Sequence, residues 1–280
     1  VSSGTTTGGT YLPKGFRQVS GTTLDNGLTI QDGSGNQYVW VEVPKKTEVY
    51  PTAGLEITEF TESEYTAIET DLHTYTNDYR ESGYEDTYYS DAATGLTSEQ
   101  YTQLKQKMLK SVYQNGGFYI GKYETGTETA RTSGNASTTP GETPVIKPNA
   151  YPYNYVTCSQ AQTLASNMEH GDRTTSLIFG VQWDLVMKYL ETKGTSQADL
   201  KTNSTSWGNY EDNAWNITNE NLKYAEYKNS SLQTWTTATE KSKTSNESIL
   251  LSTGASESFS KMGIYDLAGN VWEWTLEYTS

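Results

Sequence analysis

The sequence predicts an α+β protein with much irregular structure. Short β-type segments, scattered helical segments and long polar stretches follow one another along its 280 residues. There is no internal repeat and no regular strand–helix–strand alternation of the kind that builds a parallel sheet. We expect four regions, which are a flexible tail over residues 1–10, a small β unit over 11–56, a helical pair over 57–115 and a larger domain over 116–280.

The first two regions differ sharply in composition. Residues Val1–Thr10 are Ser, Thr and Gly apart from the first, which predicts a flexible tail. In the β unit, Leu28 and Ile30 alternate with polar residues and Asp32–Asn36 has the composition of a turn. The β-branched and aromatic run Tyr38–Val43 then predicts a strand.

Two helices are predicted between residues 57 and 115. Thr61 with Glu64, and Thr97 with Gln100, have the spacing of capping boxes at helix starts. The second helix is expected to end at Asn115–Gly117, because glycine accepts the left-handed conformation of a helix end. Steps of three and four give apolar stripes, which are Tyr65, Ile68, Leu72, Tyr75 and Tyr79 in the first helix and Tyr101, Leu104, Met108 and Val112 in the second. Such stripes usually face a core, and a stalk or assembly contact is the alternative.

The larger region begins with predicted elements and becomes irregular. In chain order we expect a strand at Phe118–Glu124, a long surface loop at Thr125–Asn154, a short helix at Ser159–Met168, a buried strand or turn at Thr175–Phe179 and a helix at Val181–Lys193. Residues Thr195–Ser260 are polar, with Trp207, Trp215 and Trp235 as isolated anchors. Loops of this length are usually functional or disordered. The segment Met262–Thr275 is dense in aromatic residues and glycine.

Composition excludes several classes of function. The 20 Lys and Arg against 34 Asp and Glu give a net charge of −14, which disfavours binding to nucleic acid or to anionic lipid. No apolar run reaches the roughly 18–20 residues of a membrane span. A chain rich in Tyr, Thr, Ser and Asn and poor in Lys favours an extracellular or cell-surface protein, with an ordinary acidic soluble protein as the alternative.

Few residues are suited to metal or nucleophilic chemistry. Cys158 is the single cysteine, which rules out an internal disulfide and a cysteine-based zinc site. His73 and His170 are the only histidines, so a multi-histidine metal site or a Ser–His hydrolase has little material. Because the chain starts at Val1 rather than Met, we expect a processed or excised product.

The C-terminal motif carries a family resemblance. Gly263–Thr275 (GIYDLAGNVWEWT) closely resembles the signature of the formylglycine-generating enzyme (sulfatase-modifying factor) family, whose fold is a variant of the C-type-lectin fold. Phe118–Thr125, Tyr155–Met168 and Ser176–Tyr189 resemble further pieces of that family in the same order. The resemblance implies this fold for residues 116–280, in a domain that is incomplete at its C-terminal end.

The resemblance argues against catalysis. Active members oxidise a sulfatase cysteine to formylglycine with copper held by two cysteines, which follow the motif beyond an Arg-Gly-Gly-Ser-Trp stretch. Here the sequence ends six residues after Trp274, and Cys158 does not match that pair. The expectation is therefore a non-catalytic relative. The alternative is a copper-dependent formylglycine-generating oxidase whose catalytic C-terminal part lies outside this chain.

Members of the family also bind structural calcium within the motif. By position, Asp266 and Glu273 would supply carboxylate oxygens, and Gly269 and Val271 would supply backbone carbonyls. The resemblance gives structural roles to three more residues, with Asn270 holding the loop and the rings of Trp272 and Trp274 filling the core. The alternative is that the two carboxylates are plain surface groups.

A second family calcium site lies in the loop before the motif. Its candidate ligands here, by residue type alone, are Asp212, Asn213 and Asn216.

These observations predict a non-enzymatic extracellular surface protein stabilised by calcium. It would be either an adhesin-like binding domain or a subunit of a filament or virion. Its partner would be a protein or glycan ligand, or copies of itself. Relatives in diversity-generating retroelement systems, including phage proteins, vary residues just after such a motif to bind different targets. Leu12–Val43 also resembles a segment of pilin-like surface proteins of Gram-positive gut bacteria, which is consistent with a pilus or other surface structure.

Overall fold

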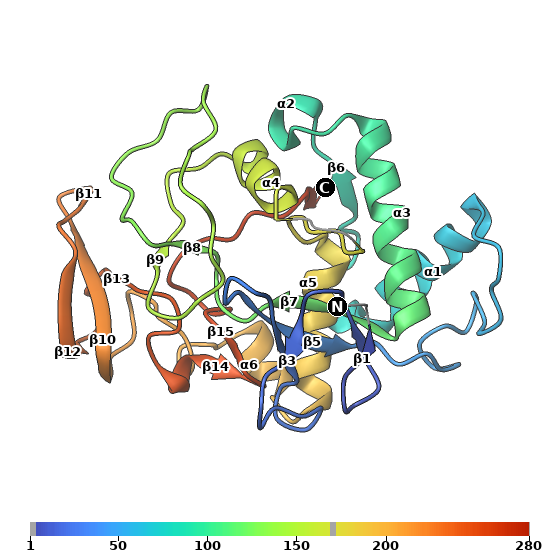
Figure 1. Cartoon of the computed structure of the whole chain (residues 1–280), viewed down its shortest axis with the longest axis horizontal. Coiled ribbons are helices and arrows are strands. Elements are labelled where there is room, and N and C mark those ends of the chain that lie inside the picture. Colours follow the sequence, from blue (N-terminus) through green and yellow to red (C-terminus); the bar gives the residue numbers. More distant parts are fainter. Residues whose placement is uncertain (1–3, 169–171, 280) are drawn as a thin grey trace.

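The computed structural model describes residues 4–168 and 172–279. These residues form a mixed α+β structure of six α-helices and several small antiparallel sheets, as the sequence predicted. Helix α5 lies near the middle, with α1 and α3 on one side and the sheet that contains β10 and β12 at the opposite end (Figure 1). No helix within the described ranges is both long and apolar enough to cross a membrane.

The helices and strands have the following bounds. The α-helices are α1 Glu62–Tyr75, α2 Asp91–Thr94, α3 Ser98–Asn115, α4 Cys158–Ser166, α5 Gly180–Thr192 and α6 Gln197–Lys201, with 3₁₀ turns at Asn77–Tyr79 and Glu257–Phe259. The strands of the first half are β1 Gly4–Thr5, β2 Tyr11–Leu12, β3 Arg17–Gln18, β4 Thr29–Gln31, β5 Gln37–Glu42, β6 Asp86–Tyr88, β7 Gly117–Gly121 and β8 Gly126–Thr127. Those of the second half are β9 Tyr151–Pro152, β10 Trp215–Lys228, β11 Ser231–Leu232, β12 Thr236–Lys243, β13 Ile249–Leu251, β14 Ser260–Lys261, β15 Ile264–Tyr265 and β16 Glu277–Thr279.

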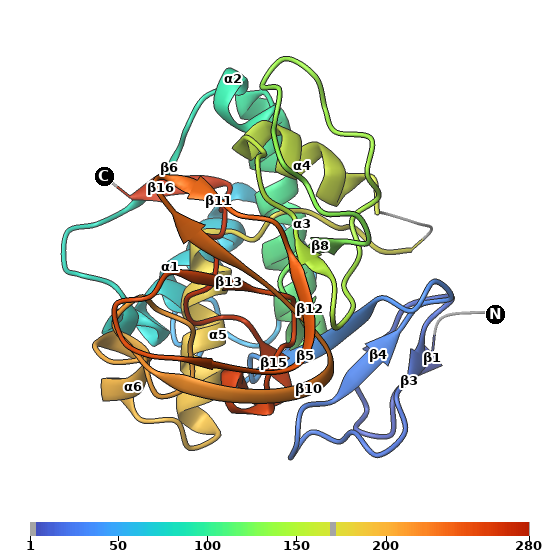
Figure 2. The same ribbon diagram turned by 90° about the vertical axis from the view of Figure 1, so that its left-hand side faces the viewer.

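One sheet joins two of the predicted regions. Its antiparallel order is β3-β4-β5-β7, and Trp40 of β5 is paired with Tyr119 of β7. The main hydrophobic core runs from Val39 to Leu276 and draws side chains from β5, α1, α3 and α5. The predicted β unit, helical pair and larger domain therefore share one core, although β1, β3 and β4 project to one side (Figure 2).

The predicted helix starts are confirmed at atomic detail. The hydroxyl of Thr97 accepts a hydrogen bond from the backbone N–H of Gln100 at 3.1 Å, and the Gln100 side chain accepts one from the Thr97 N–H at 2.9 Å. Thr61 plays the same part for α1, and Gly116 ends α3 with φ of 73°. The stripe of α1 is shorter than predicted, because the helix ends at Tyr75 and Tyr79 lies in a 3₁₀ turn.

A buried ion pair fastens the C-terminal strand to the helices. Strand β16 pairs with β6, and the side chain of Glu277 is buried. One oxygen of this carboxylate lies 2.6 Å from the Lys105 ammonium of α3. The other accepts a hydrogen bond from the backbone N–H of Gly180 at the start of α5, at 2.8 Å.

The predicted N-terminal tail is wrong from residue 4 onward. Gly4–Thr5 pairs with Tyr11–Leu12, and the backbone N–H of Thr6 donates to the carbonyl of Thr10 at 2.9 Å. Gly9 adopts φ of 79°, which lets the chain reverse direction in a short turn. The polar composition that suggested a linker is compatible with this exposed hairpin. Residues 1–3 and His170 lie outside the described residues.

The polar stretch 195–260 is also more regular than predicted. It contains helix α6 and a sheet in which β10 pairs with β11, β12 and β13. Trp215, Ile217 and Leu222 of β10 are buried in a second, smaller core, whereas much of the opposite face is exposed. An antiparallel sheet with one solvated face needs few apolar residues, so the low hydrophobicity of this stretch led to a wrong prediction of irregular structure.

The predicted strand or turn at residues 175–179 contains no strand, and Phe179 at the start of α5 is fully buried.

A candidate ligand cavity beside the C-terminal motif

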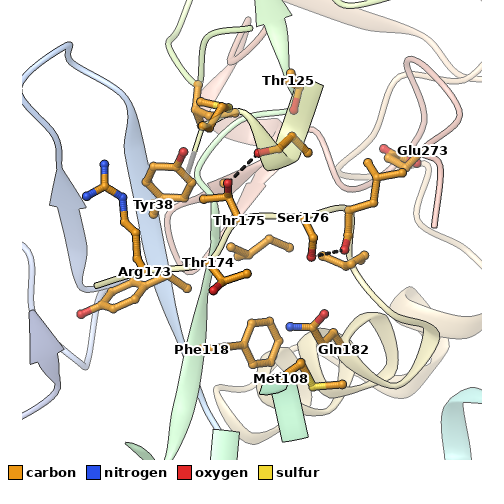
Figure 3. A pocket seen from close by; sticks show the side chains of 18 of the residues that line it. Tyr38, Met108, Phe118, Thr125, Arg173, Thr174, Thr175, Ser176, Gln182 and Glu273 are labelled. Carbon is orange, nitrogen blue, oxygen red and sulfur yellow. Dashed lines mark hydrogen bonds between the residues drawn. The ribbon is translucent and has the colours of Figure 1, made fainter. Parts of the chain in front are cut away.

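A cavity of about 640 Å³ lies where the N-terminal sheet, three helices and the C-terminal motif meet. Its walls come from β7, α3, α4, α5, residues 172–178 and residues 265–274. Figure 3 shows Phe118 and Met108 on one side of it and Thr125 on another. The volume falls in the range of about 300–1,000 Å³ that is typical of small-molecule sites.

Most of the wall is apolar. Strand β7 contributes Phe118 and Ile120, and α3 contributes Met108. Leu164 of α4 and Trp183 of α5 complete this part of the lining. Helices α3 and α5, which also supply side chains to the main core, thus border the cavity as well.

An aromatic and cationic group forms one side of the cavity. Tyr38 and Arg173 lie together on this side in Figure 3. The Arg173 guanidinium lies 4.4 Å from the centre of the Phe16 ring and donates to the backbone carbonyl of Lys14 at 3.2 Å. Burial, together with the charge of Asp32, raises the pKa of Tyr38 to about 12, so its hydroxyl stays neutral at physiological pH.

Carboxylates lie elsewhere on the lining. Glu124, Asp266 and Glu273 all border the cavity, and Figure 3 places Glu273 across from Tyr38. One oxygen of Glu124 accepts a hydrogen bond from the Asn270 amide. The other, Oε2, is buried and has no hydrogen-bond partner among the described residues.

These carboxylates affect one another electrostatically. Burial raises the pKa of Asp266 to about 7, against the backbone N–H groups of Gly254 and Glu124 that donate to it at 2.9 and 3.3 Å. Burial and the charge of Asp266 hold the pKa of Glu124 well above its usual range. Glu273 at the rim is an exposed residue, but its carboxyl is partly buried. This burial raises the pKa of Glu273, and the charge of Asp266 adds a smaller effect in the same direction.

Asn270 holds the motif loop as expected. Its backbone is left-handed, with φ of 67°, and its N–H donates to the carbonyl of Asn209 at 2.8 Å. Its side-chain oxygen accepts from the N–H of Leu251 and from the Asn209 amide, both at 2.9 Å. At the neighbouring Gly269 an added Cβ would lie 2.1 Å from the Asn209 carbonyl oxygen, so only glycine allows the two loops to come this close.

The two motif tryptophans do not fill the core. Trp272 is fully exposed and Trp274 is half exposed, which overturns the expectation drawn from the family. The segment after Asn270 has no helix or strand until β16. Both rings border the cavity, and the Trp274 indole N–H donates to the carbonyl of Val156 at 3.2 Å.

The predicted calcium ligands are only partly gathered. Asp266, Val271 and Glu273 border the same cavity, whereas Gly269 packs against Asn209. In the described parts of the chain, no three or more His, Cys, Asp or Glu side chains form a group that could hold a metal ion. Two carboxylates with backbone carbonyls would still be hard oxygen ligands of the kind that calcium prefers.

The candidates for a second calcium site do not converge. Asp212 and Asn216 are exposed, and the side-chain oxygen of Asn213 accepts from the N–H of Tyr210 at 3.0 Å. The buried ammonium of Lys243 instead donates to the carbonyls of Tyr210, at 2.6 Å, and Asn213. A lysine therefore supplies the positive charge in this loop.

Cys158 occupies the first position of α4, where its thiol is half-buried and donates to the carbonyl of Thr275 at 3.4 Å. Burial raises the pKa of the thiol, so the reactive thiolate is disfavoured. His73 lies on α1, 3.6 Å from the carboxylate of Glu69.

Sequence reasoning missed Glu124, Tyr38 and Arg173 as site residues. The only sequence signal for Glu124 is a carboxylate that ends the apolar strand Phe118–Glu124, and this pattern is too common to mark a site. A comparison of the chain with protein-family models, curated proteins and solved structures gives no match. The resemblance to formylglycine-generating enzymes therefore depends on the sequence motifs alone.

Proposed function

We propose that this protein is a non-enzymatic extracellular surface protein that binds a ligand in the cavity beside its C-terminal motif. The observation that carries the proposal is the cavity itself, about 640 Å³ in volume, with apolar walls and a few polar groups at defined places. This combination is typical of ligand sites, because apolar walls supply affinity and isolated polar groups fix orientation.

The exposed rings support a binding role. Trp272 and Trp274 border the cavity while remaining largely in water. Large exposed aromatic side chains are unfavourable in water and are common at recognition surfaces. We assign them to ligand contact, in place of the structural role expected from the sequence.

The finer fold assignment is part of the proposal. We assign residues 116–280 to the formylglycine-generating-enzyme-like variant of the C-type-lectin fold, since the motif residues Asn270 and Gly269 tie the loop of Asn209 to the motif. We keep calcium as a proposed structural ion at Asp266, Gly269, Val271 and Glu273. It would offset the repulsion between the two carboxylates. The half-buried thiol of Cys158 gives no specific support to the oxidase alternative.

Filling the cavity tests the proposal. Nile red, a neutral apolar dye, should bind saturably and become fluorescent. Ala165→Trp places a large ring on the cavity wall and should weaken dye binding at least tenfold. Ala198→Trp, on the exposed surface of α6, is the matched control and should have no effect. Absent binding, or equal binding by all three proteins, would refute the proposal. Regular filaments of the purified protein in electron microscopy would instead favour an assembly subunit.

A further inference from the structure

We propose that the ligand of this cavity carries a cationic nitrogen, an ammonium or guanidinium group, on an apolar or aromatic body, and that Glu124 pairs with the cation. This inference rests on the proposed binding function and adds the chemical class of the ligand.

The first argument is the unpartnered oxygen of Glu124. The Asn270 amide donates to one carboxylate oxygen, which fixes the orientation of the group. The buried Oε2 lacks a partner among the described residues, and Glu124 borders the cavity. A buried acceptor without a donor is destabilising, and more so if it is charged. A donor on the ligand would satisfy it.

The second argument is the missing positive charge. Several other buried carboxylates among the described residues have a cation, whereas Asp71 is held by the backbone N–H groups of Thr52 and Ala53. Glu277 has Lys105 at 2.6 Å, and Asp86 and Asp184 have Arg80 at 2.6 and 2.8 Å.

The cavity carboxylates lack this compensation. In the described ranges, no Lys or Arg forms an ion pair with Glu124, Asp266 or Glu273. Buried charges are normally paired, so this end of the cavity lacks a cation of the kind that Lys105 and Arg80 supply elsewhere in the fold. Glu124 lies outside the set of proposed calcium ligands, so its Oε2 would still lack a partner with that ion bound.

The rest of the cavity defines the body of the ligand. Phe118, Leu164 and Trp183 offer apolar surface, which favours an aliphatic or aromatic group. The rings of Trp272 and Trp274 at the rim can also attract a cation through their faces. A free amine and the side chain of a lysine or arginine in a polypeptide share this chemistry.

A matched pair of test ligands separates charge from shape. Phenethylamine and phenethyl alcohol differ mainly in the charged nitrogen, and calorimetric titration in the presence of chelator measures both without interference from metal. We expect the amine to bind at least tenfold more tightly than the alcohol. Glu124→Gln, which keeps the acceptor for Asn270, should remove most of this preference while Nile red still binds. Glu128→Gln changes a carboxylate four residues away that is 74% exposed, and should leave the preference unchanged.

Each outcome bears on one of the two proposals. Equal affinity for amine and alcohol, or an amine preference that Glu124→Gln leaves intact, would overturn the cationic ligand. Failure of Nile red to bind the unmodified protein would instead refute the ligand-binding function. If Glu124→Gln does not fold, the comparison of amine with alcohol on the unmodified protein still decides whether the ligand is cationic.

A blocked peptide with phenylalanine beside lysine, measured against the same peptide with norleucine in place of lysine, identifies the source of the cation. Tighter lysine-dependent binding than that of the free amine indicates a polypeptide ligand, and weaker binding indicates a small amine.

Discussion

The buried pair of Lys105 and Glu277 offers a direct test of how the C-terminal strand is held. Lys105→Met keeps much of the apolar stem of the side chain but removes the ammonium that lies 2.6 Å from the Glu277 carboxylate. Glu277 would then remain buried without a cation. It would keep the hydrogen bonds donated by the Tyr101 hydroxyl and the backbone N–H of Gly180.

The size of the effect follows from this geometry. Removing one partner of a buried ion pair costs about 3–5 kcal/mol. Because Glu277 retains two donors, we expect the lower end, about 3 kcal/mol. Unfolding entropy of roughly 2.1 cal/mol/K per residue amounts to about 0.6 kcal/mol/K for a chain of this length. The melting temperature should therefore fall by about 5 °C.

Thermal unfolding followed by circular dichroism measures this shift. Lys107→Met removes a charge from the exposed face of the same helix and should change the melting temperature by less than about 1 °C. Adding Glu277→Gln to Lys105→Met removes the stranded charge and keeps an acceptor for Gly180, so stability should largely return. A single variant within about 1 kcal/mol of the unmodified protein, or a double variant less stable than the single one, would refute the reasoning.

Three further predictions concern the motif, the electrostatics and the metal. Gly269→Ala should cost at least about 2 kcal/mol in urea unfolding, since φ is 71° and the new Cβ would clash with the Asn209 carbonyl. Burial opposes ionisation of Glu69, but the hydrogen bond from His73 and the charge of Lys105 outweigh it and lower its pKa. That stabilisation is present above the pKa of the unfolded chain and is lost as pH falls. Glu69→Gln should therefore lower the free energy of unfolding at pH 7 by less than about 1 kcal/mol, and urea unfolding near pH 3 should show no difference from the unmodified protein. Excess chelator should lower the melting temperature by several degrees, with recovery on adding calcium, and an unchanged melting curve would remove the calcium proposal.

Local features were the most predictable part of this fold. The starts of α1 and α3 follow from Thr61 and Thr97, because a capping box involves residues only three apart. The strand at Tyr38–Val43 follows from its β-branched and aromatic run, and the loop role of Asn270 follows from the motif. Each of these is decided within a few residues of sequence.

Pairing between distant segments was less predictable. Residues 4–12 and 215–251 form sheets despite their polar composition, because each strand needs a partner elsewhere in the chain and only one apolar face. Sequence patterns do not specify that partner. The motif likewise does not specify which segments pack around its tryptophans, and Trp272 and Trp274 are exposed although burial was expected.

The sequence by itself determined the α+β class, the acidic character and the capped helices. Only the tertiary structure decided that Glu124 meets Asp266 across 142 residues of chain, with the N–H of one donating to the carboxylate of the other. It also decided that an apolar cavity opens beside them. The physical reason is that burial and the absence of a nearby cation are properties of the packed surroundings. An unpaired carboxylate is unfavourable only where the fold has removed water and supplied no partner.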